Sequence, residues 1–89
     1  MRNPVFTSAF KQDWKLVKKR GYDITELQKV IDLLINEMPL PAKYRDHQLV
    51  GNLKSHRELH IGPDWLLIYK ISGQDCIFAH TGTHTDLFD

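Results

Sequence analysis

The sequence predicts an α+β domain in which two amphipathic helices cover one face of a small antiparallel sheet. Two stretches with helical periodicity, within residues 8–38, precede alternating and continuous apolar runs within residues 56–80. The expected order is β-α-α-β-β-β, followed by a short C-terminal helical turn. With 89 residues, 42% of them hydrophobic, the chain is sized for a single domain over residues 1–89 with one modest core.

The first third of the chain contains the signals for one short strand and both helices. Residues 4–7 read as the strand, and Ser8 can cap the helix that follows. That helix has apolar residues at i, i+4 and i+7, namely Phe10, Trp14 and Val17. The second helix begins with the capping-box-like run 23–26, and its apolar stripe extends to Met38, where Pro39 and Pro41 stop it.

The second half changes to strand periodicity. Residues 56–61 alternate, and the turn Gly62-Pro63-Asp64 leads into a nearly continuous apolar run over 65–71, which indicates a central strand. Residues 72–75 form a hairpin turn, and residues 76–80 form the partner strand. Residues 39–54 have no clear periodicity, so we expect a structured loop there.

Charge and cysteine content limit the class of protein. The net charge of +1 excludes a protein that holds nucleic acid by bulk charge alone. Lys and Arg outnumber acids seven to three in residues 1–30 and are outnumbered five to eight in residues 31–89. This basic N-terminal part can steer an anionic partner or be a solvated helix face. The lone Cys76 excludes an internal disulfide, and without leader-like or membrane-spanning runs we expect a cytoplasmic protein that makes no membrane contact.

Histidine is over-represented: the chain has five, where about two are expected, and all lie in its second half. They are His47, His56, His60, His80 and His84. The spacings of His56 with His60 and of His80 with His84 resemble metal-ligand pairs. The first pair lies in a strand, where four residues span roughly 13 Å, too far for two imidazoles to share one zinc ion. We therefore expect no metal site and no cofactor, although a His-based metal-binding regulator remains an alternative. Cys76 opens a strand and reads as a small buried hydrophobe, not a nucleophile.

Metal-free acid/base chemistry suits the histidines better, because imidazole exchanges protons near neutral pH. RNA cleavage needs a base for the 2′-hydroxyl, an acid for the departing 5′-oxygen and positive charge for the phosphate. His60 ends one strand and Asp64 begins the next, so the two are expected to lie close together. His84 follows the last strand, and His47 joins them if its loop folds over the same face.

Three blocks of sequence carry a family resemblance. They are Asp46-His47-Gln48-Leu49-x-Gly51, then Arg57-Glu58-x-His60-Ile61-x-Pro63-Asp64-Trp65-Leu66-Leu67-Ile68-Tyr69, then Thr81-Gly82-Thr83-His84-x-x-Leu87-Phe88. In this order and spacing they resemble the YafQ branch of the RelE toxin superfamily. The resemblance implies a RelE-like fold and the toxin of a type II toxin–antitoxin system, an endoribonuclease that cuts mRNA in the ribosomal A site. It further implies a cognate antitoxin as partner, with operator DNA bound only through the antitoxin complex.

The resemblance also implies a set of site residues. His47, His60, Asp64 and His84 match the family's active-site positions, and Phe88 matches its C-terminal aromatic residue. Each also has a structural interpretation: His47 can cap a loop, Asp64 suits a turn, and Phe88 can fill the core.

Two further residues are candidates for substrate binding. Arg57 can contact phosphate or cover apolar surface with its stem. His80 stands where YafQ-like relatives often carry Arg, and imidazole is a weaker phosphate ligand at neutral pH. RelE itself relies on Lys and Arg, so its catalytic residues are not transferred to this chain.

The resulting hypothesis assigns a role to each residue. Asp64 or His47 takes the proton of the 2′-hydroxyl, His84 protonates the 5′-oxygen, and His60 holds the scissile phosphate and tunes Asp64. The alternative is a catalytically degenerate module that only binds an antitoxin or operator DNA.

Overall fold

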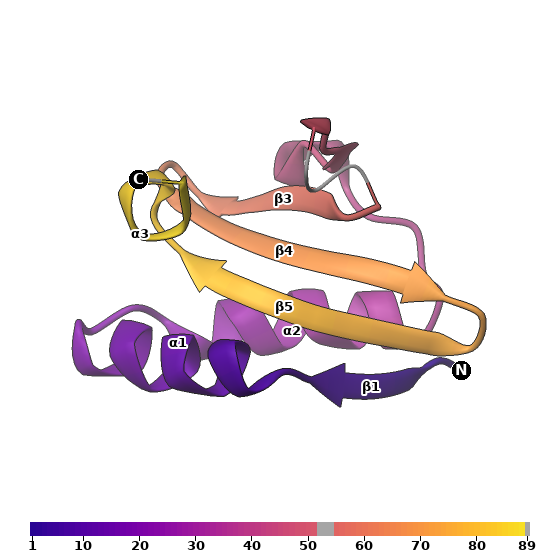
Figure 1. Cartoon of the computed structure of the whole chain (residues 1–89), viewed down its shortest axis with the longest axis horizontal. Coiled ribbons are helices and arrows are strands. Elements are labelled where there is room, and N and C mark those ends of the chain that lie inside the picture. Colours follow the sequence, from indigo (N-terminus) through magenta and orange to yellow (C-terminus); the bar gives the residue numbers. More distant parts are fainter. Residues whose placement is uncertain (52–54, 89) are drawn as a thin grey trace.

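Among the residues that the structure describes, five strands form one sheet in the order β1-β5-β4-β3-β2 (Figure 1). The computed structural model describes residues 1–51 and 55–88. Its elements are β1 (Asn3–Phe6), α1 (Ser8–Lys19), α2 (Ile24–Ile35), the 3₁₀ turn η1 (Ala42–Tyr44), β2 (His47–Gln48), β3 (Arg57–Gly62), β4 (Trp65–Ser72), β5 (Asp75–Gly82) and α3 (His84–Phe88). The expected α+β class is confirmed. In the described part of the chain, no helix is long and apolar enough to cross a membrane.

The sheet differs from the sequence expectation at both edges. β1 pairs with β5 in parallel, so the sheet is mixed and not purely antiparallel. Such a parallel pair needs a long crossover connection. Here α1, α2 and the other three strands separate β1 from β5 along the chain. At the other edge, the stretch expected to be loop contains η1 and the two-residue strand β2, which pairs His47 with Glu58 of β3.

The helix ends also differ in detail from the expected positions. Thr7, not Ser8, caps α1, because the Thr7 hydroxyl accepts the Phe10 backbone N–H at 3.0 Å. Asp23 caps α2 as expected and accepts the Thr25 N–H. α2 ends at Ile35, before the proline pair, so the last residue of the predicted stripe, Met38, lies outside the helix and is 55% exposed.

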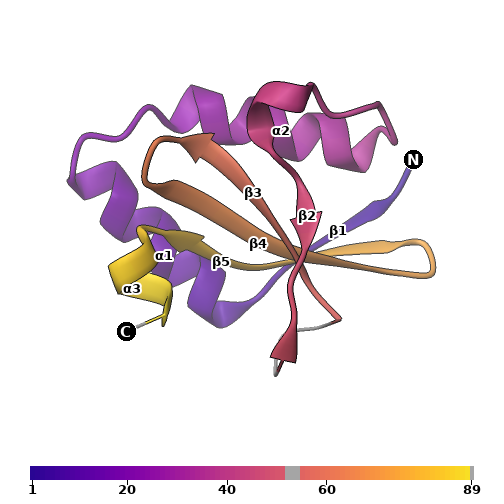
Figure 2. The ribbon, with the colours of Figure 1, turned by 90° about the horizontal axis from the view of Figure 1, so that it is seen from above.

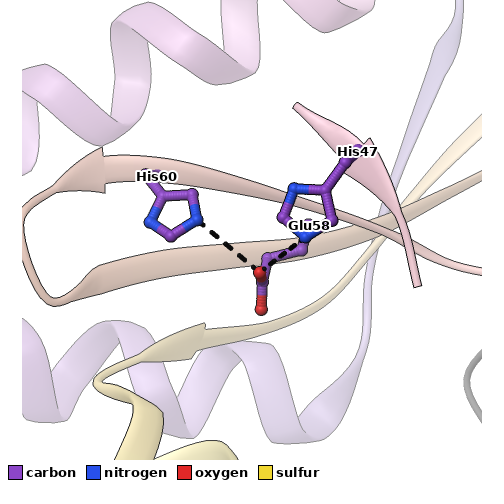
Figure 3. Close-up of side chains that lie close together, drawn as sticks. All are labelled: His47, Glu58 and His60. Atoms are coloured by element: carbon purple, nitrogen blue, oxygen red, sulfur yellow. Dashed lines mark ion pairs between the residues drawn. The ribbon is translucent and has the colours of Figure 1, made fainter. Parts of the chain in front are cut away.

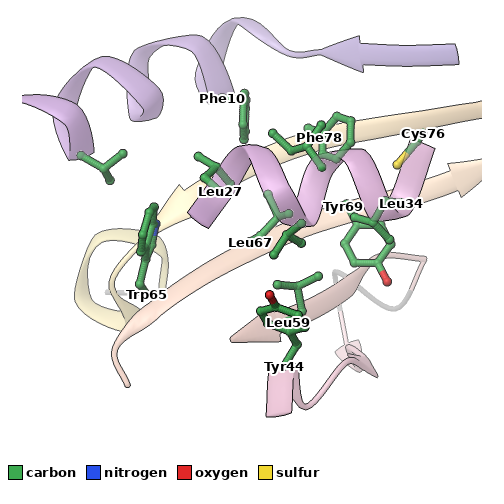
Figure 4. Close-up of a cluster of buried hydrophobic side chains, with 13 residues drawn as sticks. Phe10, Leu27, Leu34, Tyr44, Leu59, Trp65, Leu67, Tyr69, Cys76 and Phe78 are labelled. Carbon is green, nitrogen blue, oxygen red and sulfur yellow. The ribbon is translucent and has the colours of Figure 1, made fainter. Parts of the chain in front are cut away.

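The hydrophobic core lies between the helices and one face of the sheet (Figure 4). Alternate residues of the central strands, such as Leu59, Leu67 and Phe78, point into it and are fully buried. Burying one such side chain stabilises the fold by about 1.5–3 kcal/mol. Strand alternation places the intervening residues of β3, Glu58 and His60, on the opposite face.

Helix α3 lies beside the end of the β3–β4 hairpin (Figure 1), and Figure 2 shows it on the side of the sheet away from α2. Thr83 and Asp86 cap it reciprocally: each backbone N–H donates to the other side chain, at 3.0 and 3.1 Å. Arg20, at the end of α1, donates to Asp86 at 2.7 Å. These hydrogen bonds, chiefly the one from Arg20, hold the pKa of Asp86 at about 2. A five-residue helix is therefore anchored to α1 and carries His84 at its start.

We expect Arg20→Gln to raise the pKa of Asp86 from about 2 toward the ordinary value near 3.9, because its strongest hydrogen-bond donor is lost. Since the folded-state pKa is depressed, the stabilisation by Asp86 is complete above about pH 4 and is lost as the pH falls toward 2. Carbon NMR titration of the carboxyl groups measures the shift. Arg2→Gln is the control, since Arg2 donates to the Leu34 carbonyl instead. A pKa that stays near 2 in Arg20→Gln would contradict this role.

Candidate active site

Four aromatic rings lie in a row across the sheet face opposite the helices and onto α3. We call His47, His60, His84 and Phe88 the ring row. Adjacent ring centroids are 6.0 Å apart from His47 to His60, 6.0 Å from His60 to His84, and 6.4 Å from His84 to Phe88. The four residues come from β2, β3 and the two ends of α3. Residues up to 41 positions apart in the sequence thus form one continuous surface feature.

At one end of the row, His47 pairs with Glu58. Nε2 of His47 lies 3.0 Å from Oε2 of Glu58, and Nδ1 lies 2.8 Å from the Arg45 carbonyl oxygen. Both ring nitrogens therefore face oxygen atoms, and the ring is held from two sides. Figure 3 shows His47 and His60 converging on that carboxylate, with Nε2 of His60 at 3.7 Å. The Glu58 side chain is only 8% exposed.

Farther along the row, His84 pairs with Asp64. Oδ1 of Asp64 lies 2.8 Å from Nδ1 of the ring and also accepts the His84 backbone N–H at 3.2 Å. The hydrogen bonds from His84, first that of the ring, lower the pKa of Asp64. With Nδ1 held by the carboxylate, Nε2 is left to exchange a proton with a bound molecule. Both side chains are more than half exposed, so a large substrate can reach them.

His60 lies between these two pairs and has a different environment. Its side chain is 13% exposed, and Nη2 of Arg45 donates to its Nδ1 at 3.2 Å. Burial lowers the pKa of His60, and the Arg45 guanidinium lowers it further. Both effects favour the neutral form of the ring, and the exposed Arg45 beside it supplies positive charge.

The arrangement separates the groups needed for acid/base chemistry. Two histidine–carboxylate pairs, His47–Glu58 and His84–Asp64, lie on either side of His60. One pair can accept a proton while the other donates one, provided that the substrate spans the row. Arg45 adds an exposed guanidinium, a group that can bind phosphate, and Phe88 adds an exposed aromatic ring.

Arg57 lies apart from the ring row. Its guanidinium donates to both carboxylate oxygens of Asp46, at 2.7 Å for the shortest contact. The buried hydroxyl of Tyr69 donates to the same carboxylate. These hydrogen bonds fix Asp46, the residue immediately before His47. Arg57, which the sequence suggested as a substrate-binding residue, therefore has a structural contact in this fold.

His80 and His56 also lie outside the row. Nδ1 of His80 is 3.2 Å from Oδ2 of Asp13 on α1, and that oxygen also accepts the Thr81 backbone N–H. His56 follows Ser55, whose hydroxyl contacts its Nδ1 at 3.2 Å. Burial, with smaller contributions from Lys70 and His80, lowers the pKa of His56. Neither residue is brought against the acid/base pairs.

Comparison with known proteins decides the family. A model of the YafQ toxin, described as a bacterial toxin of type II toxin–antitoxin systems, matches residues 2–89. This chain belongs to the YafQ family. The mRNA interferase toxin YafQ of Escherichia coli K12 is 43% identical over 88 residues, which cover 98% of this chain and 96% of that protein.

Solved structures agree with this membership. The YafQ chain in the crystal structure of the E. coli DinJ–YafQ complex matches with a TM-score of 0.93 at 42% identity, covering all of both chains. A metal-bound toxin from Helicobacter pylori matches with a TM-score of 0.92 at 40% identity, covering 99% of this chain and all of that one. A YafQ-family toxin fold therefore positions the ring row.

Sequence reasoning missed two residues of the site in this YafQ-family chain, Glu58 and Arg45. Glu58 could have been predicted from the sequence, because it lies two residues before His60 in a strand and therefore on the same face of the sheet. No sequence pattern pointed to Arg45, which adopts a left-handed backbone conformation, with φ of 48°, in a stretch without periodicity. Only the fold brings its carbonyl to His47 and its guanidinium to His60.

The site also contains a metal-compatible donor set, where the sequence predicted none. Donor atoms of His47, Glu58 and His60 all lie within 4.8 Å of one another. The spacing in the sequence suggested His56 as a second histidine ligand beside His60. In the structure, the histidine near His60 is His47 of β2. Cys76 is fully buried, and burial raises its pKa to about 11, which is consistent with its interpretation as a core residue.

We expect Tyr69→Phe to lower the free energy of unfolding by about 1.5–3 kcal/mol, the usual range for a hydrogen bond to a charged group. The variant keeps the ring and removes only the donor to Asp46. Urea denaturation measures the change. Tyr44→Phe is the matched control, because its ring is equally buried while the hydrogen bonds to the Asp46 carboxylate come from Arg57 and Tyr69. Equal losses in the two variants would disprove a specific role for the Tyr69 hydroxyl.

Proposed function

We propose that this toxin is an mRNA interferase, an endoribonuclease that cuts mRNA in the ribosomal A site without a metal ion. Residues 1–89 act as one toxin domain in the cytoplasm. The observation that carries the proposal is the presence of two histidine–carboxylate pairs flanking His60. The name of the E. coli relative, mRNA interferase toxin, supports the same reaction class.

The first chemical step is the attack of the 2′-hydroxyl on the adjacent phosphorus. The His47–Glu58 pair accepts the hydroxyl proton while the new O2′–P bond forms. The P–O5′ bond breaks as Nε2 of His84 donates a proton to the leaving oxygen. The products are a 2′,3′-cyclic phosphate and a 5′-hydroxyl, so atoms and charges balance without a cofactor.

Asp64 acts on His84 in this mechanism, not on the 2′-hydroxyl. Its Oδ1 already accepts two hydrogen bonds from His84, and its pKa is lowered, so it is a weak base. The carboxylate holds Nδ1 and stabilises the protonated ring, as the aspartate does in a serine-protease triad. His47 is therefore the better of the two proton acceptors considered from sequence.

The remaining residues bind the RNA. Arg45 and His60 face the scissile phosphate, with the guanidinium supplying the charge. Phe88, which is 45% exposed, offers a surface on which one base can stack. Because His80 is paired with Asp13, Arg45 replaces some of the positive charge that relatives obtain from an arginine at this position.

Two partners follow from this function. A cognate antitoxin binds the toxin and blocks the site; the solved complex of the E. coli relative with DinJ supports the binding. Operator DNA is bound only through such a complex. The ribosome presents the message, so a net charge of +1 suffices, and the basic N-terminal part is available for ribosomal RNA or an acidic antitoxin segment.

We expect His84→Ala to reduce mRNA cleavage by about 100-fold or more, the usual contribution of a positioned acid or base. His60→Ala removes a phosphate contact and also reduces cleavage, and both variants abolish growth arrest on induction. His56→Gln is the control and stays toxic, because His56 lies outside the ring row. Primer extension on messages after induction measures the cleavage. If both alanine variants still arrest growth and cut mRNA, the assignment fails. A wild-type protein that binds its antitoxin but cuts no message is instead a degenerate binding module.

We expect cleavage to require translation. A reporter message with its start codon removed stays intact, whereas the translated reporter is cut within its reading frame and in register with codons. Primer extension on the two messages, in the same induced cells, makes the comparison. Equal cleavage of the two messages would refute ribosome dependence, although the protein would still be a nuclease.

We expect Asp64→Asn to lower kcat by about 10- to 100-fold with little change in KM, because Asn can donate to Nδ1 and favour the wrong tautomer of His84. Single-turnover cleavage on programmed ribosomes measures both values. A variant with wild-type kcat would show that the carboxylate does not orient the acid.

A further inference from the structure

We propose that Arg20, which follows the last residue of α1, is a positioning residue for cleavage. By holding Asp86, it fixes α3 in the place from which His84 reaches the substrate. The part of this proposal that concerns cleavage rests on the proposed function, whereas the coupling between Arg20 and His84 rests on the contacts of α3 alone. Arg20 acts through Asp86, so it is not itself a catalytic residue.

Helix α3 depends on polar contacts for its place. None of its residues is buried, and a helix of five residues is too short to be stable alone. In the described part of the chain, α3 forms two ion pairs with other elements, His84 with Asp64 and Asp86 with Arg20. The first pair includes the proposed acid. The second is therefore the pair that can hold the helix without taking part in proton transfer.

The contact between Arg20 and Asp86 fixes orientation as well as distance. Nη1 of Arg20 donates to Oδ2 at 2.7 Å and Nη2 donates to Oδ1 at 3.3 Å, so the guanidinium holds both carboxylate oxygens. The same Oδ2 accepts the Thr83 backbone N–H at 3.0 Å. One carboxylate thus joins the end of α1 to the first turn of the helix that carries His84 (Figure 2).

Arg20 is itself held by the body of the protein. Its backbone N–H donates to the Leu16 carbonyl and so closes the last turn of α1. Two residues later, the Tyr22 ring packs edge-on against Trp65, with centroids 5.0 Å apart. Trp65 belongs to the hydrophobic core. The guanidinium therefore extends from a fixed support, and α3 is placed relative to the core through it.

The backbone on the other side of Asp86 leaves little room for movement. A Cβ atom at Gly82 would lie 3.0 Å from Oδ2 and 3.1 Å from Cβ of Asp86, closer than ordinary van der Waals contact. Asp86 is thus confined between the Gly82 backbone and the Arg20 guanidinium. Because a displacement of about 1 Å can lower a rate by about 100-fold, this confinement matters for His84.

Asp64 reports whether α3 is docked. The hydrogen bonds from His84 lower the pKa of Asp64, and the nearby charge of Asp86 opposes this effect. Removing the Asp86 charge without moving the helix would therefore lower the pKa of Asp64 further. Releasing the helix would raise that pKa, because both hydrogen bonds from His84 would be lost. The two outcomes have opposite signs.

The first test is a carbon NMR titration of the carboxyl groups in the full-length toxin. We expect Asp86→Ala and Arg20→Gln each to raise the pKa of Asp64 toward its ordinary value. Arg20→Lys keeps the charge but loses the two-pronged contact, so it gives a smaller rise. Arg2→Gln is the control and leaves this pKa unchanged, since Arg2 donates to the Leu34 carbonyl. A lower or unchanged pKa of Asp64 in Asp86→Ala overturns the proposal.

The second test is single-turnover cleavage on programmed ribosomes. We expect Arg20→Gln and Asp86→Ala each to lower kcat by about 10-fold or more, because His84 is displaced. The double variant is no slower than the slower single variant, since the two residues form one contact. Arg20→Lys recovers part of kcat, and Arg2→Gln keeps all of it. Additive losses in the double variant, or wild-type kcat in both single variants, overturn the positioning role.

Gly82→Ala tests the same place without removing either charge. We expect the added methyl group to displace Asp86, to raise the pKa of Asp64 and to lower kcat. Wild-type values of both quantities would contradict the confinement of Asp86. If the wild-type toxin cuts no message, the proposed function fails, and the Asp64 titration still decides whether Arg20 positions His84.

Discussion

The nearly buried carboxylate of Glu58 is the group on which the site depends. A buried carboxylate destabilises the fold unless donors reach it. His47 reaches Glu58 from the neighbouring strand β2, and His60 lies 3.7 Å from it, two residues along β3. This requirement explains why a two-residue strand, β2, docks on β3 with His47 opposite Glu58. The Arg45 carbonyl then fixes the other side of the His47 ring.

The other half of the site is built on different contacts. α3 is too short to be stable alone, so its reciprocal cap and the Arg20–Asp86 ion pair hold it against α1. His84 begins this helix and is held by Asp64 from the β3–β4 turn. Two separately anchored elements thus meet at His60, which explains how a chain of 89 residues presents four aligned rings.

Local patterns predicted those parts of the fold that local forces determine. The helical stripes, the Asp23 cap and the central strand β4 follow from periodicity and capping chemistry. The parallel pairing of β1 with β5 joins residues more than 70 positions apart, and no local pattern encodes it. Likewise, His60, Asp64 and His84 were found from spacing and resemblance, but the roles of Arg45 and Glu58 depend on a loop that folds back onto β3.

The central claim is that side chains of the ring row carry the protons of a cleavage that uses the 2′-hydroxyl as nucleophile. A ribosome-bound mRNA with a single 2′-deoxy nucleotide at the scissile position tests it most directly. The account predicts that metal-free toxin leaves this message intact at that position while it cuts the all-ribose message to a 2′,3′-cyclic phosphate. Cleavage of the 2′-deoxy message at the same bond and rate would contradict it.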